Sequence, residues 1–161
     1  MNMTSDPKRE FLRHTLATLA YRGAKAIREA PANFADFRGC EGMRTPAQIL
    51  AHVGDVLEWA LSIAAGKQAW HESKPLPWEE ERARFFVTLT RFDQFLASEE
   101  PLQAPPEKLF QGPIADALTH VGQLALLRRM AGAAIKGENY FVAEVQSGRV
   151  GEEQPKAKRE F

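Results

Sequence analysis

Several absences narrow what this chain can be. It has a single cysteine, Cys40, so no disulfide can form within it. No apolar run follows the positive charges near the N-terminus, so we expect no signal peptide. No stretch approaches the roughly 18 apolar residues that a membrane-spanning helix requires. We therefore expect a cytoplasmic protein without a membrane partner. Cys40 has no histidine near it in the sequence, which favours a bystander thiol over a nucleophile.

A net charge is absent as well. The 21 basic and 21 acidic residues cancel to a formal charge of zero. Proteins that bind nucleic acids normally carry a basic face or excess, so we expect no nucleic-acid partner. The chain also lacks a Gly-rich phosphate loop, a GxSxG elbow and a CxxC pair. The local signatures of nucleotide binding, serine hydrolase chemistry and dithiol chemistry are therefore missing.

What the chain does have is helical periodicity. Hydrophobic residues make up 44% of its 161 residues and charged residues 26%, as in ordinary globular domains. Four segments repeat apolar residues every three or four positions and are separated by loops containing Pro and Gly. This pattern predicts four helices, at about 5–30, 45–66, 77–100 and 113–132. We predict an all-α protein, an up-and-down four-helix bundle with a short C-terminal extension.

Proline marks the expected helix starts. Ser5-Asp6-Pro7 and Thr45-Pro46 each place a capping residue before a first-turn proline, and the other two helices are expected to begin near Pro77 and Pro113. We assign residues 1–150 to one domain. Within it, residues 133–150 are compatible with a short helix packed on the bundle. The polar residues 151–161 are expected to form a flexible tail.

One histidine falls on the apolar side of the second predicted helix. His52 lies within a continuous apolar arc, with Val56 and Trp59 in the adjoining turns. Its side chain is therefore expected to point into the bundle. It is either a core histidine satisfied by one hydrogen bond or a ligand for a metal ion.

The fourth predicted helix carries a polar stripe of Asp116, His120 and Gln123, spaced at i, i+4 and i+7. This stripe is either the solvated face of the helix or an inward face that meets His52. The solvated interpretation places Arg128 and Arg129 on the core side, from which they could snorkel out near the helix end.

An inward stripe would make His52, Asp116 and His120 a candidate metal site. Two imidazoles and one carboxylate, with open positions for water or substrate, suit zinc, nickel or iron(II). A buried aspartate beside two histidines is also costly without a cation to offset its charge. His14 is expected to be a partly exposed neighbour on the first helix, and His71 a solvated loop residue. No catalytic residue follows from the sequence.

These residues lie in segments that resemble DinB-like proteins. RTPAQILAHVGDVLEWALSIAAG resembles the second helix of that family, which carries one metal-binding histidine. IADALTHVGQLALLRRMAG resembles the fourth helix, in which a histidine stands two residues before a Gly-Gln pair. ENYFVAEVQSGRVG resembles the segment that follows in some members. The resemblance assigns His52 and His120 as ligands and gives Gln123 a supporting role. A further family histidine is replaced here by Asp116, which puts metal identity, affinity and activity in question.

The resemblance implies a four-helix bundle, often a homodimer, with a divalent metal at one end. It further implies a metal-dependent transferase that uses a low-molecular-weight thiol, with a small-molecule thiol or electrophile as substrate. The alternative is a non-catalytic metal- or ligand-binding bundle or a dimeric interaction module. An enzyme should keep open coordination positions beside a pocket, whereas a structural metal site should be closed.

Overall fold

Capping side chains begin the first two helices. In the computed structural model, which describes residues 6–161, Asp6 accepts a hydrogen bond from the backbone N–H of Lys8 at 2.9 Å. Thr45 and Gln48 form a capping box, in which each side chain accepts the backbone N–H of the other residue. Both caps precede a first-turn proline, as predicted. Ser5, the other expected cap, lies outside the described residues.

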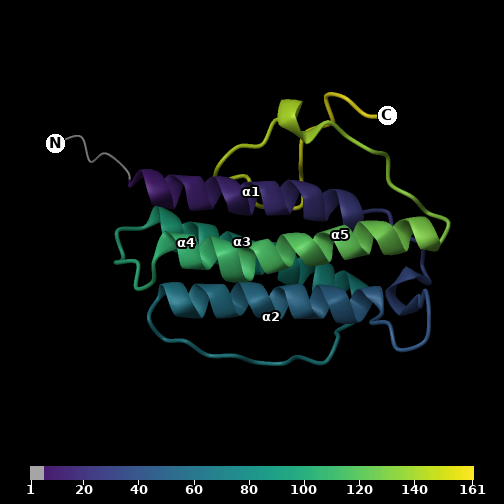
Figure 1. The fold of residues 1–161 in the computed structure, drawn as a ribbon, viewed down its shortest axis with the longest axis horizontal. Coiled ribbons are helices and arrows are strands. Elements are labelled where there is room, and N and C mark those ends of the chain that lie inside the picture. Colours follow the sequence, from purple (N-terminus) through teal and green to yellow (C-terminus); the bar gives the residue numbers. More distant parts are fainter. Residues whose placement is uncertain (1–5) are drawn as a thin grey trace.

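The described residues form four long helices and four short helical pieces (Figure 1). The long helices are α1 (Pro7–Ile27), α2 (Pro46–Ala64), α3 (Trp78–Ala97) and α5 (Ala115–Met130). The short pieces are α4 (Pro106–Leu109), a π-helical turn (Phe110–Ile114) and the 3-10 turns Phe34–Asp36 and Tyr140–Val142. No helix within residues 6–161 is both long and apolar enough to cross a bilayer. The prediction of a helical bundle is confirmed.

The fourth long helix starts earlier than predicted. α4, the π-helical turn and α5 follow one another without a break, so the helix begins at Pro106 and not near Pro113. Pro113 lies inside the π-helical turn. Proline has no N–H to donate and its ring crowds the preceding turn of an α-helix. A locally widened turn accommodates it, so this proline marks a distortion within the helix.

The helices do not alternate in direction along the chain, so the up-and-down prediction is wrong. The first turns of α1 and α4 meet in the ion pair of Lys8 and Glu107, and Arg128 near the end of α5 donates to Ala26 near the end of α1. The continuous helix formed by α4 and α5 therefore runs parallel to α1. The end of α2 lies beside the segment after α3, where Gln103 donates to the Ala64 carbonyl at 2.9 Å. α2 and α3 thus also run parallel, opposite to α1 and α5 (Figure 1).

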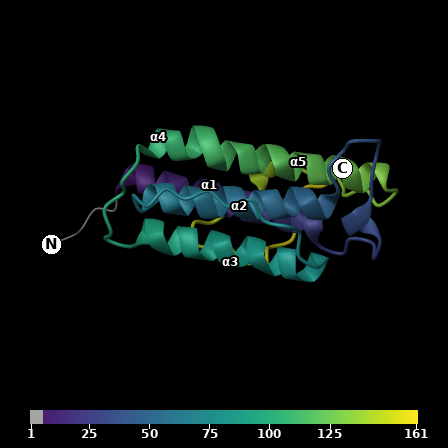
Figure 2. The same ribbon diagram turned by 90° about the horizontal axis from the view of Figure 1, so that it is seen from below.

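A long crossover allows α2 and α3 to run in the same direction. Residues 65–77, thirteen in all, can span about 43 Å when extended. The nineteen-residue α2 is only about 28 Å long. The crossover therefore returns along α2, as Figure 2 shows. Hydrogen bonds fix it to that helix, among them those from the Ala69 N–H to Ser62 Oγ at 3.0 Å and from the Ser73 N–H to Asp55 Oδ2 at 2.9 Å.

Each long helix packs against two others. α1 and α2 lie diagonally opposite, and both contact α3 and α5 (Figure 2). Most of the apolar residues that repeat every three or four positions along α1 and α3 are buried in the bundle core, as the periodicity predicts. The largest fully buried side chains are Phe34, Phe85, Phe92, Leu12, Leu16, Leu19, Ile27, Ile49, Leu50, Leu57, Leu89 and Leu96.

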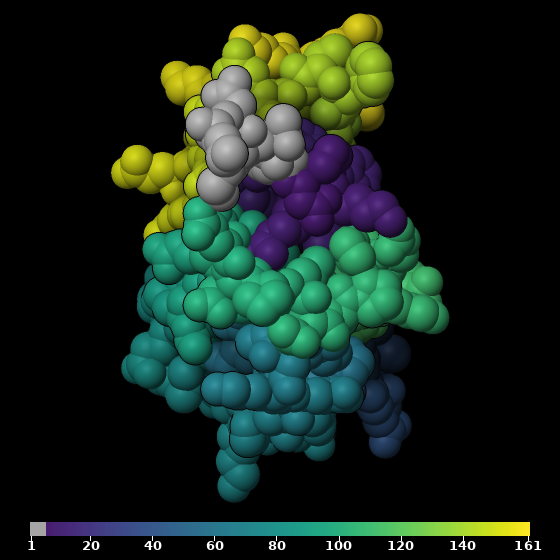
Figure 3. Space-filling model, turned by 90° about the vertical axis from the view of Figure 1, so that its left-hand side faces the viewer, coloured from purple at the N-terminus to yellow at the C-terminus, as the bar shows by residue number. Residues whose placement is uncertain are grey.

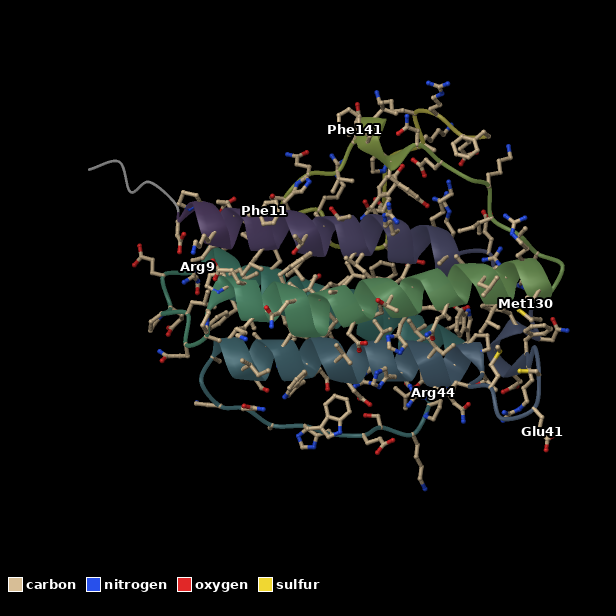
Figure 4. The ribbon with its side chains drawn as sticks, in the orientation of Figure 1. Arg9, Phe11, Glu41, Arg44, Met130 and Phe141 are labelled. Atoms are coloured by element: carbon tan, nitrogen blue, oxygen red, sulfur yellow. The ribbon has the colours of Figure 1, made fainter. Side chains whose placement is uncertain are left out.

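Arginines from neighbouring helices satisfy the carbonyls at two helix ends. Arg9 at the start of α1 donates to four backbone carbonyls at the end of α3 and in the loop after it (Figure 4). Arg128 is buried and donates to the carbonyls of Ala26 and Arg28 at the end of α1. These bonds replace the intrahelical partners that the last turn of a helix lacks. Arg128 is therefore a buried cap, whereas Arg129 is exposed.

The C-terminal residues lie across α1, on the side away from α2 (Figures 1 and 3). Glu138 is buried there and accepts hydrogen bonds from Tyr21 and from Lys25 Nζ, the latter at 2.8 Å. Phe161 donates to the Gly137 carbonyl at 3.0 Å. Residues 133–150 contain one 3-10 turn and no α-helix. Residues 151–161, which we expected to form a flexible tail, fold back onto this segment through the hydrogen bond of Phe161 to Gly137.

A largely buried ion pair between Arg84 and Asp55 links α3 to α2. The two side chains are 15% and 2% exposed, with a nitrogen–oxygen distance of 2.5 Å. Gly54 permits this approach, because a Cβ there would lie 3.0 Å from the guanidinium carbon of Arg84. Burial favours a raised pKa for Asp55, but the N–H of Ser73 and the charge of Arg84 outweigh it and hold that pKa below its usual value.

We expect Arg84→Ala to lower the free energy of unfolding by about 3–5 kcal/mol, because it leaves the buried Asp55 carboxylate without its cation. Arg91→Ala, which removes an exposed arginine from the same helix, should change it by less than about 0.5 kcal/mol. Urea unfolding followed by circular dichroism at neutral pH measures both values. Equal stabilities of the two variants would contradict the account of this pair.

A second prediction concerns the C-terminal residues. Glu138→Ala removes the acceptor of Tyr21 and Lys25, so residues 137–161 should exchange backbone amide hydrogens at least tenfold faster, while α2 and α5 stay protected. Hydrogen exchange with mass spectrometry measures this. Glu144→Ala is the matched control, because Glu144 forms only an exposed pair with Lys158. Unchanged exchange in Glu138→Ala would show that this contact does not hold the segment.

Candidate metal centre

The three predicted ligands lie together between α2 and α5. Asp116 and His120 stand one helical turn apart on α5, and His52 faces them from α2. One ligand atom from each residue can be chosen such that all three lie within 4.8 Å of one another. The polar stripe of α5 therefore turns toward His52 at this point, as the inward interpretation predicts. Gln123, at the far end of the stripe, is exposed.

The spacing between His52 Nε2 and the Asp116 carboxylate resembles that of two ligands around one ion. Asp116 lies between the two histidines, with Oδ2 at 3.5 Å from His52 Nε2 and Oδ1 at 3.5 Å from His120 Nδ1. These distances are long for a hydrogen bond. Two ligands of a tetrahedral ion, each bonded at about 2.1 Å, are separated by about 3.4 Å. The ring centroids of the two histidines are 4.7 Å apart, so a small cation would contact both rings and the carboxylate.

The backbone of α5 fixes the tautomer of His120. Its Nδ1 lies 2.8 Å from the Asp116 carbonyl oxygen. A carbonyl oxygen can only accept, so Nδ1 carries the proton and donates it there. The lone pair is then on Nε2, which becomes the metal-binding nitrogen. Histidine ligands commonly use this arrangement, in which the second ring nitrogen is held by a carbonyl or carboxylate.

The electrostatics at His52 favour its neutral form. Partial burial lowers the pKa of His52 below its usual value, and the positive charges of His120 and Arg44 add to this effect. The carboxylate of Asp116 opposes it without reversing it. A neutral imidazole offers a lone pair, whereas a protonated one cannot bind a metal. His52 is therefore ready to act as a ligand at neutral pH and somewhat below it.

The three side chains are accessible from solvent to different extents. The exposed fractions are 12% for His120, 24% for His52 and 46% for Asp116. The crossover brings Trp70 next to His52, with ring centroids 6.0 Å apart, and Trp59 packs edge-on against Trp70. The sequence pattern did not single out Trp70, because its place depends on the path of residues 65–77. The site thus has an aromatic wall on one side and open space on others.

Two hollows adjoin the three side chains. The first, of about 410 Å³, lies between α2 and the crossover and reaches His52. The second, of about 390 Å³, lies between α5 and the start of α2 and reaches His120 and Gln123. Each is large enough for a small molecule. Open space beside the ligands is what a catalytic metal site requires and a closed structural site lacks.

The remaining candidates stand apart from this cluster. His14 lines a groove between α1 and the C-terminal residues. His71 is exposed on the crossover, and Cys40 is exposed in the loop before α2. In the part of the chain that the structure describes, only His52, Asp116 and His120 form a group of histidine, cysteine or acidic side chains compact enough to share one ion.

No protein-family model matches this chain, and neither does a curated protein or a solved structure. The fold and the site themselves define its class. It is an all-helical bundle in which two pairs of parallel helices place two histidines and an aspartate at a half-open junction. The function has to be inferred from these residues.

In metal-free protein we expect His52 to titrate below the usual histidine pKa of about 6.5, because burial and the nearby positive charges disfavour its protonated form. His120→Gln removes one of those charges and should raise the pKa of His52. NMR titration of the imidazole Cε1–H resonances measures both. His71→Gln, on the exposed crossover, should leave the pKa of His52 unchanged. A His52 pKa above 6.5 in the wild type would contradict this description of the site.

Proposed function

We propose that this protein binds one divalent transition metal through His52, Asp116 and His120 and acts on a small molecule beside it. The observation that carries the proposal is the convergence of the three side chains. One ligand atom from each residue lies within 4.8 Å of the other two, next to open space. Two imidazoles and one carboxylate suit zinc, nickel or iron(II).

The charges support a cation at this point. Without one, the Asp116 carboxylate lies 3.5 Å from a nitrogen of each imidazole and makes no short hydrogen bond to either ring. A divalent ion would bind the carboxylate and both ring lone pairs at once. The lowered pKa of His52 favours its neutral, metal-binding form, and the hydrogen bond from His120 Nδ1 to the Asp116 carbonyl leaves Nε2 of His120 as the nitrogen that would face the metal.

The reaction we propose is transfer involving a low-molecular-weight thiol, as the resemblance to DinB-like proteins implies. A bound metal would supply a positive charge that lowers the pKa of a thiol or water beside it. The residues of this chain would hold that metal through two helices and leave access from both hollows. Trp70 would exclude water from one side of His52. Homodimer formation, also implied by the resemblance, belongs to the same proposal.

We expect purified wild-type protein, re-loaded with zinc, nickel or iron(II), to hold close to one metal ion per chain. His120→Ala should lose most of it, because two ligands on different helices do not complete the set. His71→Ala is the matched control and should bind as the wild type does, because His71 is an exposed crossover residue. Mass spectrometric metal analysis after desalting measures all three. Equal, negligible metal in wild type and His120→Ala would reject the site.

A measurement of catalytic turnover distinguishes an enzyme from a bundle that only binds metal. The metal-loaded wild type should accelerate thioether formation between a small thiol and an alkyl halide, a reaction in which the thiol loses its proton and the halide leaves. His120→Ala should lack this acceleration. Stoichiometric metal without turnover across a panel of thiols and electrophiles would support a non-catalytic, metal-binding bundle instead.

A further inference from the structure

The two hollows beside the candidate metal centre share one charged residue, Arg44. It lines the hollow that reaches His52 and also the hollow that reaches His120. Figure 4 shows it beside the first turn of α2. Arg44 immediately precedes Thr45, the residue that caps the N-terminus of α2. A positively charged side chain is therefore common to the linings of both hollows, which favours an anion beside it.

The first hollow is polar and contains charges of both signs. Gln48, Asp55 and residues 72–75 line it together with Arg44 and His52. The charge of Asp55 is already offset by Arg84. Of the other charged groups in the lining, Lys74 adds a positive charge and Glu72 a negative one. Arg44, Lys74 and Glu72 together therefore leave this lining with one net positive charge.

The second hollow is mainly apolar. Met43, Ile49, Leu126 and Leu127 make up most of its lining, with His120, Gln123 and Arg44 as the polar members. Leu126 is 55% exposed, although large apolar side chains in a helix normally face the core. An apolar wall that opens beside a candidate reaction centre is suited to the hydrocarbon part of a small molecule.

The side chain of Arg44 is not used by the fold. Arg38, in the same loop, donates to the Met43 carbonyl at 2.9 Å. By contrast, the structure gives the exposed guanidinium of Arg44 no hydrogen bond or salt bridge to any residue from 6 to 161. Arginine provides planar, paired donors that match a carboxylate. Arg44 can therefore bind an anion without breaking a contact.

We infer that the two hollows form one bipartite site for a small amphipathic carboxylate. Its carboxylate contacts Arg44, its hydrocarbon part lies against Met43 and Leu126, and its remaining polar group faces His52 and His120. This inference rests on the proposed function for the role of the metal, because it names the class of substrate that would reach that centre. The contact with Arg44 itself requires no metal.

The test uses metal-free protein, with acetate, butyrate, hexanoate and hexan-1-ol as probes and titration calorimetry as the readout. Hexanoate should bind wild type more tightly than acetate, by up to about threefold per added methylene that becomes buried. Hexan-1-ol should bind about tenfold more weakly than hexanoate, because it lacks the charge that Arg44 recognises.

Substitutions show which residues cause these differences in affinity. Arg44→Gln should weaken hexanoate binding about tenfold and leave hexan-1-ol unchanged, whereas Arg91→Gln, an exposed arginine on α3, should behave as the wild type does. Leu126→Asn should reduce the increase in affinity from acetate to hexanoate. Equal hexanoate affinity in wild type and Arg44→Gln, or no saturable binding to wild type, overturns the inference.

The metal analysis and the hexanoate titration test separate claims, so either claim can be rejected while the other stands. Loss of hexanoate binding in Arg44→Gln together with absent metal in wild type would keep the carboxylate site and reject the metal centre. Stoichiometric metal with Arg44-independent binding would keep the metal centre and reject the carboxylate site. When both results are positive, zinc should tighten hexanoate binding in wild type, because it adds a second positive charge at the junction.

Discussion

Asp55 is the point at which three elements of the fold are joined. One of its oxygens pairs with Arg84 of α3 at 2.5 Å, and the other accepts the N–H of Ser73 from the crossover at 2.9 Å. Asp55 stands on α2 three residues after His52, so the same contacts set the environment of the histidine. They hold the crossover along α2, which places Trp70 beside His52 and closes one side of the first hollow. Asp55 is thus a buried residue of α2 that anchors the crossover next to the candidate site.

The site combines firm support with partial exposure. His120 is held through Nδ1 by the carbonyl of Asp116, whereas the nearest polar contact of His52 is the Asp116 carboxylate at 3.5 Å. A core histidine would be more deeply buried and would make a shorter hydrogen bond. Asp116 is the most exposed of the three side chains. The arrangement therefore matches a half-open centre better than a satisfied core residue, and the positive region around Arg44 extends it toward anionic ligands.

Local features of the chain could be predicted, and features that depend on topology could not. Residue type and spacing predict the helix caps Asp6 and Thr45 and the apolar face of each helix. They also predict that His52 points into the bundle. Helix direction did not follow, because the length of residues 65–77 permits a crossover but does not require one. Asp55 is a charged residue that nothing in the sequence marks as buried, yet it is buried beneath α3 and the crossover. Pro113 looked like a helix start because a π-helical turn leaves no mark in the apolar period. Trp70 and Arg44 gain their significance only from neighbours that are distant in the sequence.

The most direct test of the central claim is anomalous X-ray scattering at the zinc edge from crystals of zinc-loaded protein. The account predicts one strong anomalous peak between α2 and α5, within about 2.2 Å of His52 Nε2, His120 Nε2 and one oxygen of Asp116. At least one coordination position should face the hollows. A peak at another place on the chain, or none at this junction in protein that is saturated with zinc, would contradict the assignment of these three residues as a metal centre.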